Sequence, residues 1–427
     1  GCPIRYHSPS NIEPMRRPLT ALLLPPVAVL AQTPQRLSLT EAETLWQEHN
    51  RELQLARTAV SGAEADVRTA SQLPNPQLSL NLSQISPSTG YGAGPWKDKK
   101  MDNVLRLDQL IERGSKRELR VRGADARLDA SRRDLDDTGR LQLLALQQTY
   151  YDLRLAQEKL RLASESAAVY DKGLETGRLR LKAGDISQVD LARLDIDKSR
   201  ADNEARQTQA DLEQSQVALA YLIGAESDAA QLVAGDDWPP LDSRQLKRGD
   251  LEQRPDVEAA RLRMVAAEAA RDLARAQKTR DVTVGLQYEH NMQNEPTDSF
   301  GFGVSVPLFI WHEYEGDIAR AESDLATARL LYQRTLSQAV GSADQAASAL
   351  RSAEDRRRRL ESGFLADAER VAKAAELAYS KGGMSLIDLL DARRTLRQVQ
   401  LEAATARADH AKALAAWRLQ ADYGKTK

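Results

Sequence analysis

Apolar residues along this chain recur every three or four positions over unusually long stretches. From Glu112 to about Leu181 this helical pattern continues for about 70 residues, or about 105 Å at 1.5 Å per residue. A second stretch, Gly316 to Ser380, gives about 65 residues and about 98 Å. Neither helix would fit inside a compact domain. The sequence therefore predicts an elongated protein that is mainly α-helical.

The first long helix carries two apolar stripes. Leu143, Leu146 and Tyr150 lie on one stripe, and Leu144 with Tyr151 lies on a second stripe beside it. A dimeric coiled coil needs only one such seam, so two stripes favour helices packed side by side in a curved wall. Shorter helices, stacked end to end in pairs, would line each long one. They are predicted at Thr40 to Leu73, Ser187 to Leu222, Pro255 to Arg280 and Ser385 to Gln420.

Other segments alternate apolar and polar residues with period two, as strands do. Leu78 to Ser83 and Phe300 to Val306 each place apolar side chains on one face and small or polar ones on the other. The pattern also fits a soluble hairpin with one buried face. However, each whole strand is predicted to be about 9 to 11 residues long, which is the length of a tilted strand that crosses a bilayer. Candidate residues of a flanking aromatic girdle are Tyr91, Trp96, Trp311 and Tyr314.

The predicted elements recur in the same order at an offset of about 200 residues, which indicates an internal tandem repeat. Asn50-Arg51-Glu52-Leu53 corresponds to Arg254-Pro255-Asp256-Val257, and the turn that begins at Lys182 corresponds to the turn that begins at Lys381. Each half reads helix, strand, strand, long helix, turn, helix. We therefore divide the chain into a first repeat (32–223), a linker rich in turn residues (224–250) and a second repeat (251–427).

The N-terminal region has the pattern of a secretory signal peptide. Met15-Arg16-Arg17 is followed by a mostly apolar run from Leu19 to Ala31 that contains two prolines and is too short for a transmembrane helix. We predict a signal peptide at 15–31, a mature start near Gln32 and an upstream segment, 1–14, without structural role. Lipidation of Cys2 stays open. No other stretch is long enough for a transmembrane helix, so a membrane-spanning part would consist of β-strands.

Composition and motifs exclude several classes of function. The 427 residues include 60 Lys+Arg and 62 Asp+Glu, which leaves no basic field for nucleic acid. A single cysteine excludes intramolecular disulfides and thiolate zinc clusters. There is no nucleophile elbow, HExxH or Walker A loop, so neither an enzyme nor a cofactor is predicted. His290 and His312 lack zinc spacing, so no metal site is expected. The run Arg356 to Arg359 is predicted to be a solvated helix face.

Three motifs together resemble those of the TolC-like outer membrane efflux factors, over essentially the whole mature chain. They are Leu73-Pro74-Asn75-Pro76-Gln77-Leu78, Val306-Pro307-Leu308-Phe309 followed by Gly316, and Ile387-Asp388-Leu389-Leu390-Asp391-Ala392. The resemblance implies that three protomers each give four strands to a 12-stranded barrel in the outer membrane, and that their helices continue it as a long periplasmic tunnel, an α-helical barrel. Independently, four strands would leave two open edges that cannot face lipid.

The resemblance also implies partners and site residues. The partners are a periplasmic adaptor and an inner-membrane pump of the resistance-nodulation-division type. Tyr379, Asp388 and Asp391 match residues at the periplasmic mouth of the tunnel, where six carboxylates of a trimer would favour cations. Ser385 with Asp388 also fits a helix capping box, and Met384 stands where some relatives carry a basic residue that locks the mouth. The turn residues expected to contact the adaptor are Gly184, Asp185, Gly382 and Gly383.

The chain is therefore expected to be a trimeric outer-membrane channel that passively conducts substrate from a pump to the outside. Its length and the strand end at Pro307-Leu308-Phe309 look most like the branch that serves cobalt, zinc and cadmium pumps. Two alternatives remain: the same channel with drugs or secreted proteins as cargo, and a periplasmic coiled-coil scaffold.

Overall fold

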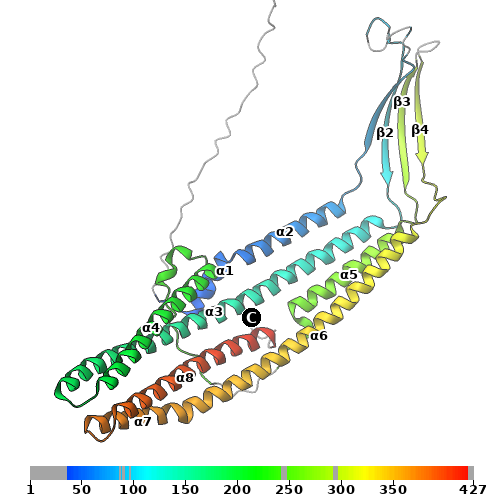
Figure 1. The fold of residues 1–427 in the computed structure, drawn as a ribbon. Coiled ribbons are helices and arrows are strands. Elements are labelled where there is room, and N and C mark those ends of the chain that lie inside the picture. Colours follow the sequence, from blue (N-terminus) through cyan, green and yellow to red (C-terminus); the bar gives the residue numbers. More distant parts are fainter. Residues whose placement is uncertain are drawn as a thin grey trace, which may run out of the picture.

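The computed structural model describes residues 36–85, 88, 92–95, 98–241, 248–291 and 297–421. The predicted signal peptide and upstream segment, Cys2, Tyr91 and Trp96 lie outside these residues. The described chain is a long, bent rod with a sheet at one end and two helical hairpins at the other (Figure 1). The prediction of an elongated, mainly helical protein with four strands is confirmed.

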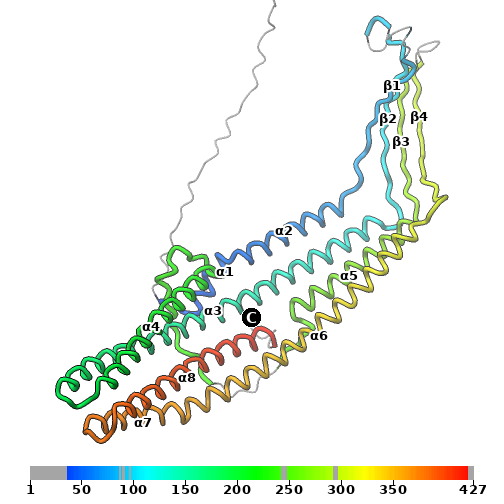
Figure 2. Tube along the Cα trace, in the orientation of Figure 1, coloured from blue at the N-terminus to red at the C-terminus, as the bar shows by residue number. Residues whose placement is uncertain are grey.

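The two halves of the chain follow the same order of elements (Figure 2). Each half contributes a helix, two strands, a long helix and a returning helix. The first half has α1 (Leu39–His49), α2 (Arg51–Ser71), β1 (Gln77–Ser83), β2 (Asp102–Ile111), α3 (Lys116–Ala183) and α4 (Gln188–Ile223), followed by a 3-10 turn, Glu226–Gln231. The second half has a 3-10 turn (Leu251–Gln253), α5 (Pro255–Ala276), β3 (Val282–Asn291), β4 (Thr297–Ser305), α6 (Glu315–Arg359), α7 (Leu365–Ser380) and α8 (Leu386–Gln420).

The longest helix, α3, has 68 residues and starts at Lys116 rather than at the predicted Glu112. The delay has a local cause, because Gly114 and Ser115 take left-handed φ values of 73° and 56°. A Cβ on Gly114 would lie 2.8 Å from Thr279, so the turn needs glycine. The buried Lys116 then donates to the carbonyl oxygen of Thr279 at 2.9 Å and pairs with Asp281 at 2.8 Å. These contacts join the two halves of the chain where the helices meet the sheet.

The predicted single helix from Thr40 to Leu73 is instead two helices separated by Asn50. This residue has an extended conformation, with ψ 121°, and its Oδ1 accepts a hydrogen bond from the amide of Leu53 at 3.1 Å. Asparagine is a favoured N-cap because its side chain replaces a missing helical acceptor. The helix α2 therefore begins at the position equivalent to the start of α5, as the repeat predicts.

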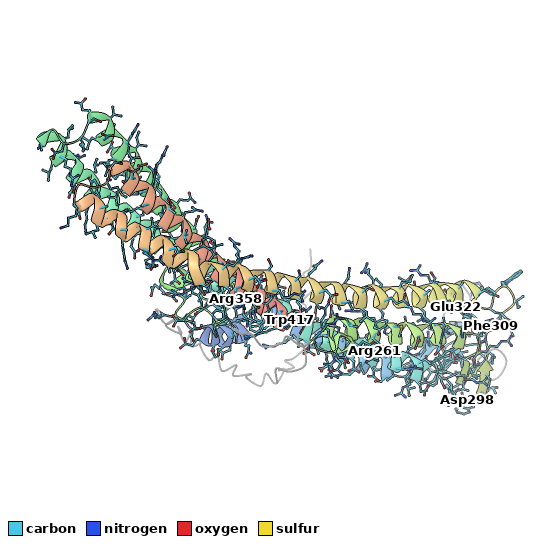
Figure 3. All side chains as sticks on the ribbon, turned by 90° about the horizontal axis from the view of Figure 1, so that it is seen from below. Arg261, Asp298, Phe309, Glu322, Arg358 and Trp417 are labelled. Carbon is cyan, nitrogen blue, oxygen red and sulfur yellow. The ribbon has the colours of Figure 1, made fainter. Side chains whose placement is uncertain are left out.

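The second long helix is interrupted where the sequence predicts continuity. A π-helical turn, Leu360–Phe364, separates α6 from α7, and the chain changes direction near Arg358 (Figure 3). The predicted solvated arginine face is wrong for Arg357, which is buried beside this turn. Its Nη1 donates to the carbonyl oxygen of Pro239 at 2.6 Å and to Nδ1 of His410 at 3.0 Å.

The four strands form one antiparallel sheet in the order β1-β2-β3-β4. In the register, Leu107 lies opposite both Leu78 and Leu286, and Leu286 lies opposite Phe302, so one face is apolar across all four strands. These side chains are exposed, and Phe302 keeps 72% of its accessible surface. The other face carries mostly small and polar residues, together with Val104 and Leu110 of β2. None of the described helices is both long enough and apolar enough to cross a membrane.

Midway along the rod, Tyr150 fastens two connecting segments to α3. The side chain is buried, its hydroxyl donates to the carbonyl oxygen of Leu37 at 2.9 Å, and it accepts from the amides of Gly235 and Asp236, each at 3.2 Å. Burial raises the pKa of Tyr150 to about 12, so the phenol stays protonated. Leu37 also forms a parallel bridge with Ala234. One hydroxyl thus joins three stretches of chain.

Replacing Tyr150 with Phe is expected to lower the free energy of unfolding by about 1–3 kcal/mol, because the half-buried amide of Asp236 loses its acceptor and the buried hydrogen bond to Leu37 is lost. Denaturant-induced unfolding of the purified protein in detergent measures this. Tyr221→Phe is the matched control, since Tyr221 is exposed. Equal midpoints for the two variants would contradict the role assigned to the hydroxyl.

Candidate gate at the helical hairpin tips

The end of the rod opposite the sheet is formed by two helix-turn-helix tips. In the α3–α4 turn, Gly184 has a φ of 83° and donates to the carbonyl oxygen of Leu181 at 3.0 Å. In the α7–α8 turn, Gly382 has a φ of 77° and donates to the carbonyl oxygen of Tyr379 at 3.0 Å. Glycine is favoured in such left-handed helix ends. The four predicted tip residues, Gly184, Asp185, Gly382 and Gly383, are all exposed.

Serine and aspartate cap the helix that follows each turn. The amide of Asp190 donates to Ser187 Oγ at 3.1 Å, and the amide of Asp388 donates to Ser385 Oγ at 3.2 Å. Each serine hydroxyl in turn donates to the aspartate carboxylate, at 2.8 Å in the first tip and 2.7 Å in the second. The capping interpretation of Asp388 thus has a direct structural basis. Its carboxylate remains exposed at the tip.

Tyr379 joins the two hairpins. Arg180, near the end of α3, donates from Nη1 to the Tyr379 hydroxyl at 2.8 Å. The same guanidinium lies over the tyrosine ring, with its carbon 4.6 Å from the ring centroid. A hydrogen bond and a cation–π contact therefore hold α7 against α3.

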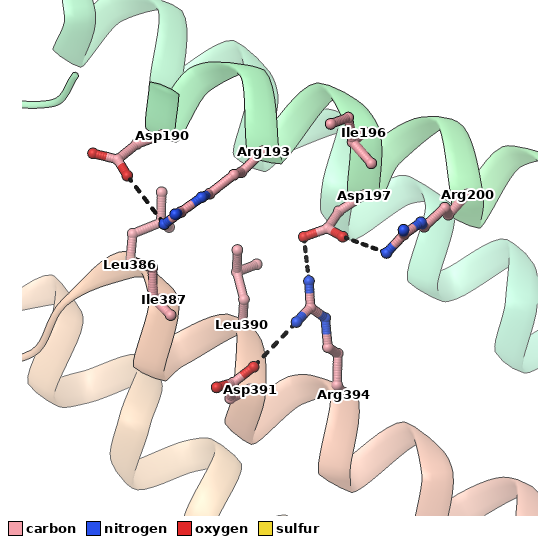
Figure 4. A pocket seen from close by; sticks show the side chains of 10 residues that line it. All are labelled: Asp190, Arg193, Ile196, Asp197, Arg200, Leu386, Ile387, Leu390, Asp391 and Arg394. Atoms are coloured by element: carbon pink, nitrogen blue, oxygen red, sulfur yellow. Dashed lines mark hydrogen bonds and ion pairs between the residues drawn. The ribbon is translucent and has the colours of Figure 1, made fainter. Parts of the chain in front are cut away.

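Asp391 takes part in a second connection between the hairpins (Figure 4). Arg394, one turn further along α8, donates to Asp391 at 3.1 Å and also to Asp197 on α4. Burial lowers the pKa of Arg394, but the charge of Asp197 and the hydrogen bond to it outweigh burial and raise that pKa above its ordinary value. Arg397 pairs with Glu204 of α4 one further turn along. Charged contacts therefore connect α8 to α4.

A cleft of about 430 Å³ lies between the first turns of α4 and α8. Its acids and bases are paired, since Arg193 lies 3.9 Å from Asp190 and Arg200 lies 3.9 Å from Asp197. The two predicted gate aspartates therefore have different surroundings: Asp388 is an exposed cap, and Asp391 shares a cation. The lining residues are Asp190, Arg193, Ile196, Asp197, Arg200, Leu386, Ile387, Leu390, Asp391 and Arg394.

The sequence motifs do not indicate the partners of the predicted site residues, which are Arg180, Arg394 and Asp197. A signal for them exists, because Arg180 and Tyr379 are 199 positions apart and Asp197 and Arg394 are 197 apart. Both separations nearly equal the repeat offset. Near-equivalent positions of the two repeats therefore face each other at the tips, and residues one repeat apart with complementary chemistry were candidates for contact.

The two histidine clusters do not form metal sites in the part of the chain that the structure describes. His290 Nδ1 lies 2.6 Å from Asp298 on the neighbouring strand, and the His312 ring packs edge-on against Tyr314. Across the described residues, no group of three or more His, Cys, Asp or Glu side chains is arranged to hold a metal ion.

Known proteins share both sequence features and the fold of this chain. The sequence profile of the family described as "Outer membrane efflux protein" matches residues 44–225 and 250–419, which covers both repeats. The chain belongs to this family. The family profile thus matches once in each repeat of this outer membrane efflux protein and leaves the linker between 225 and 250 unmatched.

Several relatives of this efflux protein are named for metal cations. It is 25% identical to the cobalt-zinc-cadmium resistance protein CzcC of Cupriavidus metallidurans, over 86% of this chain and 85% of CzcC. It is 26% identical to the cation efflux system protein CusC of Escherichia coli O157:H7, over 82% of this chain and 78% of CusC. The fold matches that of the Campylobacter jejuni CmeC outer membrane channel with a TM-score of 0.76, at 18% identity, over 90% of this chain and 85% of CmeC.

Replacing Arg394 with Ala is expected to loosen α8 from α4, because one cation serves two carboxylates there. We expect faster amide hydrogen exchange in the first turns of both helices, with a coupling free energy to Asp197 of about 0.2–1 kcal/mol in a double-mutant cycle. Arg370→Ala is the control, since Arg370 pairs at 2.7 Å with Asp367, which belongs to its own helix. Exchange that rises equally in both variants would rule out a connection specific to Arg394.

Proposed function

We propose that this chain is the outer-membrane channel of a tripartite efflux system and passively conducts heavy-metal cations to the outside. The main support for the proposal is that two different surfaces lie at opposite ends of one rod. A sheet with an exposed apolar face lies at one end, and two capped hairpin tips lie at the other. The 68-residue helix α3 sets the distance between them at about 100 Å.

The sheet supports assembly into a closed barrel. Within the described residues, β1 and β4 each have a neighbouring strand on one side only. Unpaired backbone groups in hydrocarbon cost several kcal/mol each, so β4 of one copy must pair with β1 of the next. Three copies would close a 12-stranded barrel, with the apolar face toward lipid and the small, polar face toward the lumen. The helices would then continue as a periplasmic tunnel.

The cargo and partners are inferred from relatives. CzcC and CusC are named for cobalt, zinc and cadmium resistance and for cation efflux, and they match this chain over most of its length. A pyoverdine export protein, OpmQ of Pseudomonas putida, matches at 24% identity, so cargo differs among relatives. We propose metal cations as the cargo, delivered by a resistance-nodulation-division pump through a periplasmic adaptor that docks at Gly184, Asp185, Gly382 and Gly383.

The tips are proposed to be the gate. Arg180 with Tyr379, and Arg394 with Asp197, hold the α7–α8 hairpin against the α3–α4 hairpin within one chain. We propose that the mouth widens when α7 and α8 move outward, a movement that these contacts oppose. Arg180 and Arg394 thus supply positive charges at the tips, where Met384 replaces the basic residue that some relatives carry. Asp388 stays exposed at the tip and would line the mouth with its copies.

Cells that lack this chain are expected to become sensitive to zinc, cobalt or cadmium and to recover when the gene is restored. Phe302→Arg should not restore resistance, because arginine on the lipid face of a barrel costs about 2–4 kcal/mol at the midplane. Gly301→Arg, which changes the neighbouring residue on the other face, should assemble in the outer membrane.

Sensitivity of the deletion strain to antibiotics alone would favour drugs as cargo. A protein found soluble in the periplasm would favour the periplasmic coiled-coil scaffold.

Replacing Asp388 and Asp391 together with Asn is expected to reduce cation selectivity and block by divalent ions in planar bilayers, while trimers still assemble. The six carboxylates of a trimer attract cations, whereas Asn keeps the size and hydrogen bonding of Asp. If capping were the whole role, the variant would lose about 1 kcal/mol of stability and conduct like the parent. Asp190→Asn, which weakens the equivalent cap of α4, is the control.

A further inference from the structure

The small, polar face of the sheet carries one cationic side chain among the described strand residues. Arg106 is the only Lys or Arg in the four strands as described, and the register places it on this face, opposite Gln287. The acids Asp102, Asp108 and Glu289 share the face. Three acids against one arginine leave two negative charges per chain. This face therefore has a net negative charge, and Arg106 is the one positively charged side chain on it among the described strand residues.

Asp108 holds Arg106 by its guanidinium. The two residues are two positions apart on β2 and so lie on the same face. Arg106 Nε lies 2.9 Å from Asp108 Oδ1 and 2.8 Å from Oδ2, so one donor is shared by both oxygens. The carboxylate thus fixes the direction of the arginine side chain along the sheet.

Two glycines on the neighbouring strands make room for this pair. A Cβ on Gly285 of β3 would lie 2.3 Å from Asp108 Oδ1 and 3.0 Å from Arg106 Nη2. A Cβ on Gly303, which pairs with Gly285 from β4, would lie 3.6 Å from the same Nη2. Gly285 is the one buried residue in β3, although the face is open. The guanidinium therefore lies flat across β3 toward β4.

We propose that Asp108 is a selectivity-determining residue of the channel: it neutralises Arg106 and holds it against Gly285 and Gly303, so that the barrel favours cations. The inference rests on the proposed channel function and deepens it. In a closed trimer, three such pairs would lie at one level, where their neighbours on the polar face are uncharged: Gln77, Ser79, Gln287 and glycines. Without Asp108, three arginines would extend into the passage and repel cations.

The test measures the reversal potential of the purified full chain in planar bilayers under a potassium chloride gradient. Asp108→Asn should lower the potassium-to-chloride permeability ratio at least about twofold, because it removes the charge that neutralises Arg106. Gly285→Ala should lower the ratio in the same direction with no change of charge, because its Cβ displaces the Asp108 carboxylate. The matched control is Gly301→Ala, whose Cβ makes only an ordinary 3.7 Å contact with Gln287.

A double variant tests whether the effect of Asp108→Asn depends on the charge of Arg106. Arg106→Gln with Asp108→Asn restores two negative charges per chain and should return the ratio to the parent value. A parent that forms no conducting channel would overturn the proposed function and this inference together. A conducting parent whose ratio is unchanged by Asp108→Asn would overturn the inference alone, and Gly285→Ala that behaves like Gly301→Ala would overturn the clamped geometry.

Discussion

Backbone groups at the two edges of the sheet impose the constraint on which the assembly depends. In water an open strand edge is tolerable, but in hydrocarbon every unpaired amide and carbonyl costs several kcal/mol. The edges β1 and β4 continue directly into the helical rod through α2 and α6. Closing the sheet between copies would therefore bring α6 of one copy beside α2 of the next and would order the helices around the same axis. The positions of the tips follow from pairing at the opposite end of the molecule.

Much of this fold was predictable because its signals are local. Period two in Leu78 to Ser83 and period three to four along α3 each report which faces are apolar, whatever the rest of the chain does. The errors are also local. The extended backbone of Asn50 ends α1 and its side chain caps α2, and Gly114 with Ser115 delays α3, although the apolar pattern runs through both places. Periodicity describes faces, whereas capping and turn residues decide where helices begin.

Only some residues of the candidate site can be proposed from the sequence, because the residues that they contact come from distant parts of the chain. A motif was enough to select Tyr379, Asp388 and Asp391, but it did not indicate Arg180 or Asp197, which lie almost 200 positions away. Arg357 shows the same limit: a run of four arginines is usually solvated, yet this one meets Pro239 and His410, which approach it from other segments. Whether a charge is solvated depends on packing that one segment does not encode.

The π-helical turn between α6 and α7 changes which side of the helix is covered. Before it, residues seven apart are buried: Ala343, Leu350 and Arg357. After it, the next two members of that series, Phe364 and Val371, are exposed, and Ala372 is buried instead. The π-helical turn takes up one extra residue, so each later residue lies about 100° away from where a regular α-helix would place it. If the same residues were wound as a regular α-helix, Phe364 and Val371 would face inward in place of Ala372, and their larger side chains would push α7 away from α8. The face that α7 packs against α8 thus depends on the one extra residue in this turn.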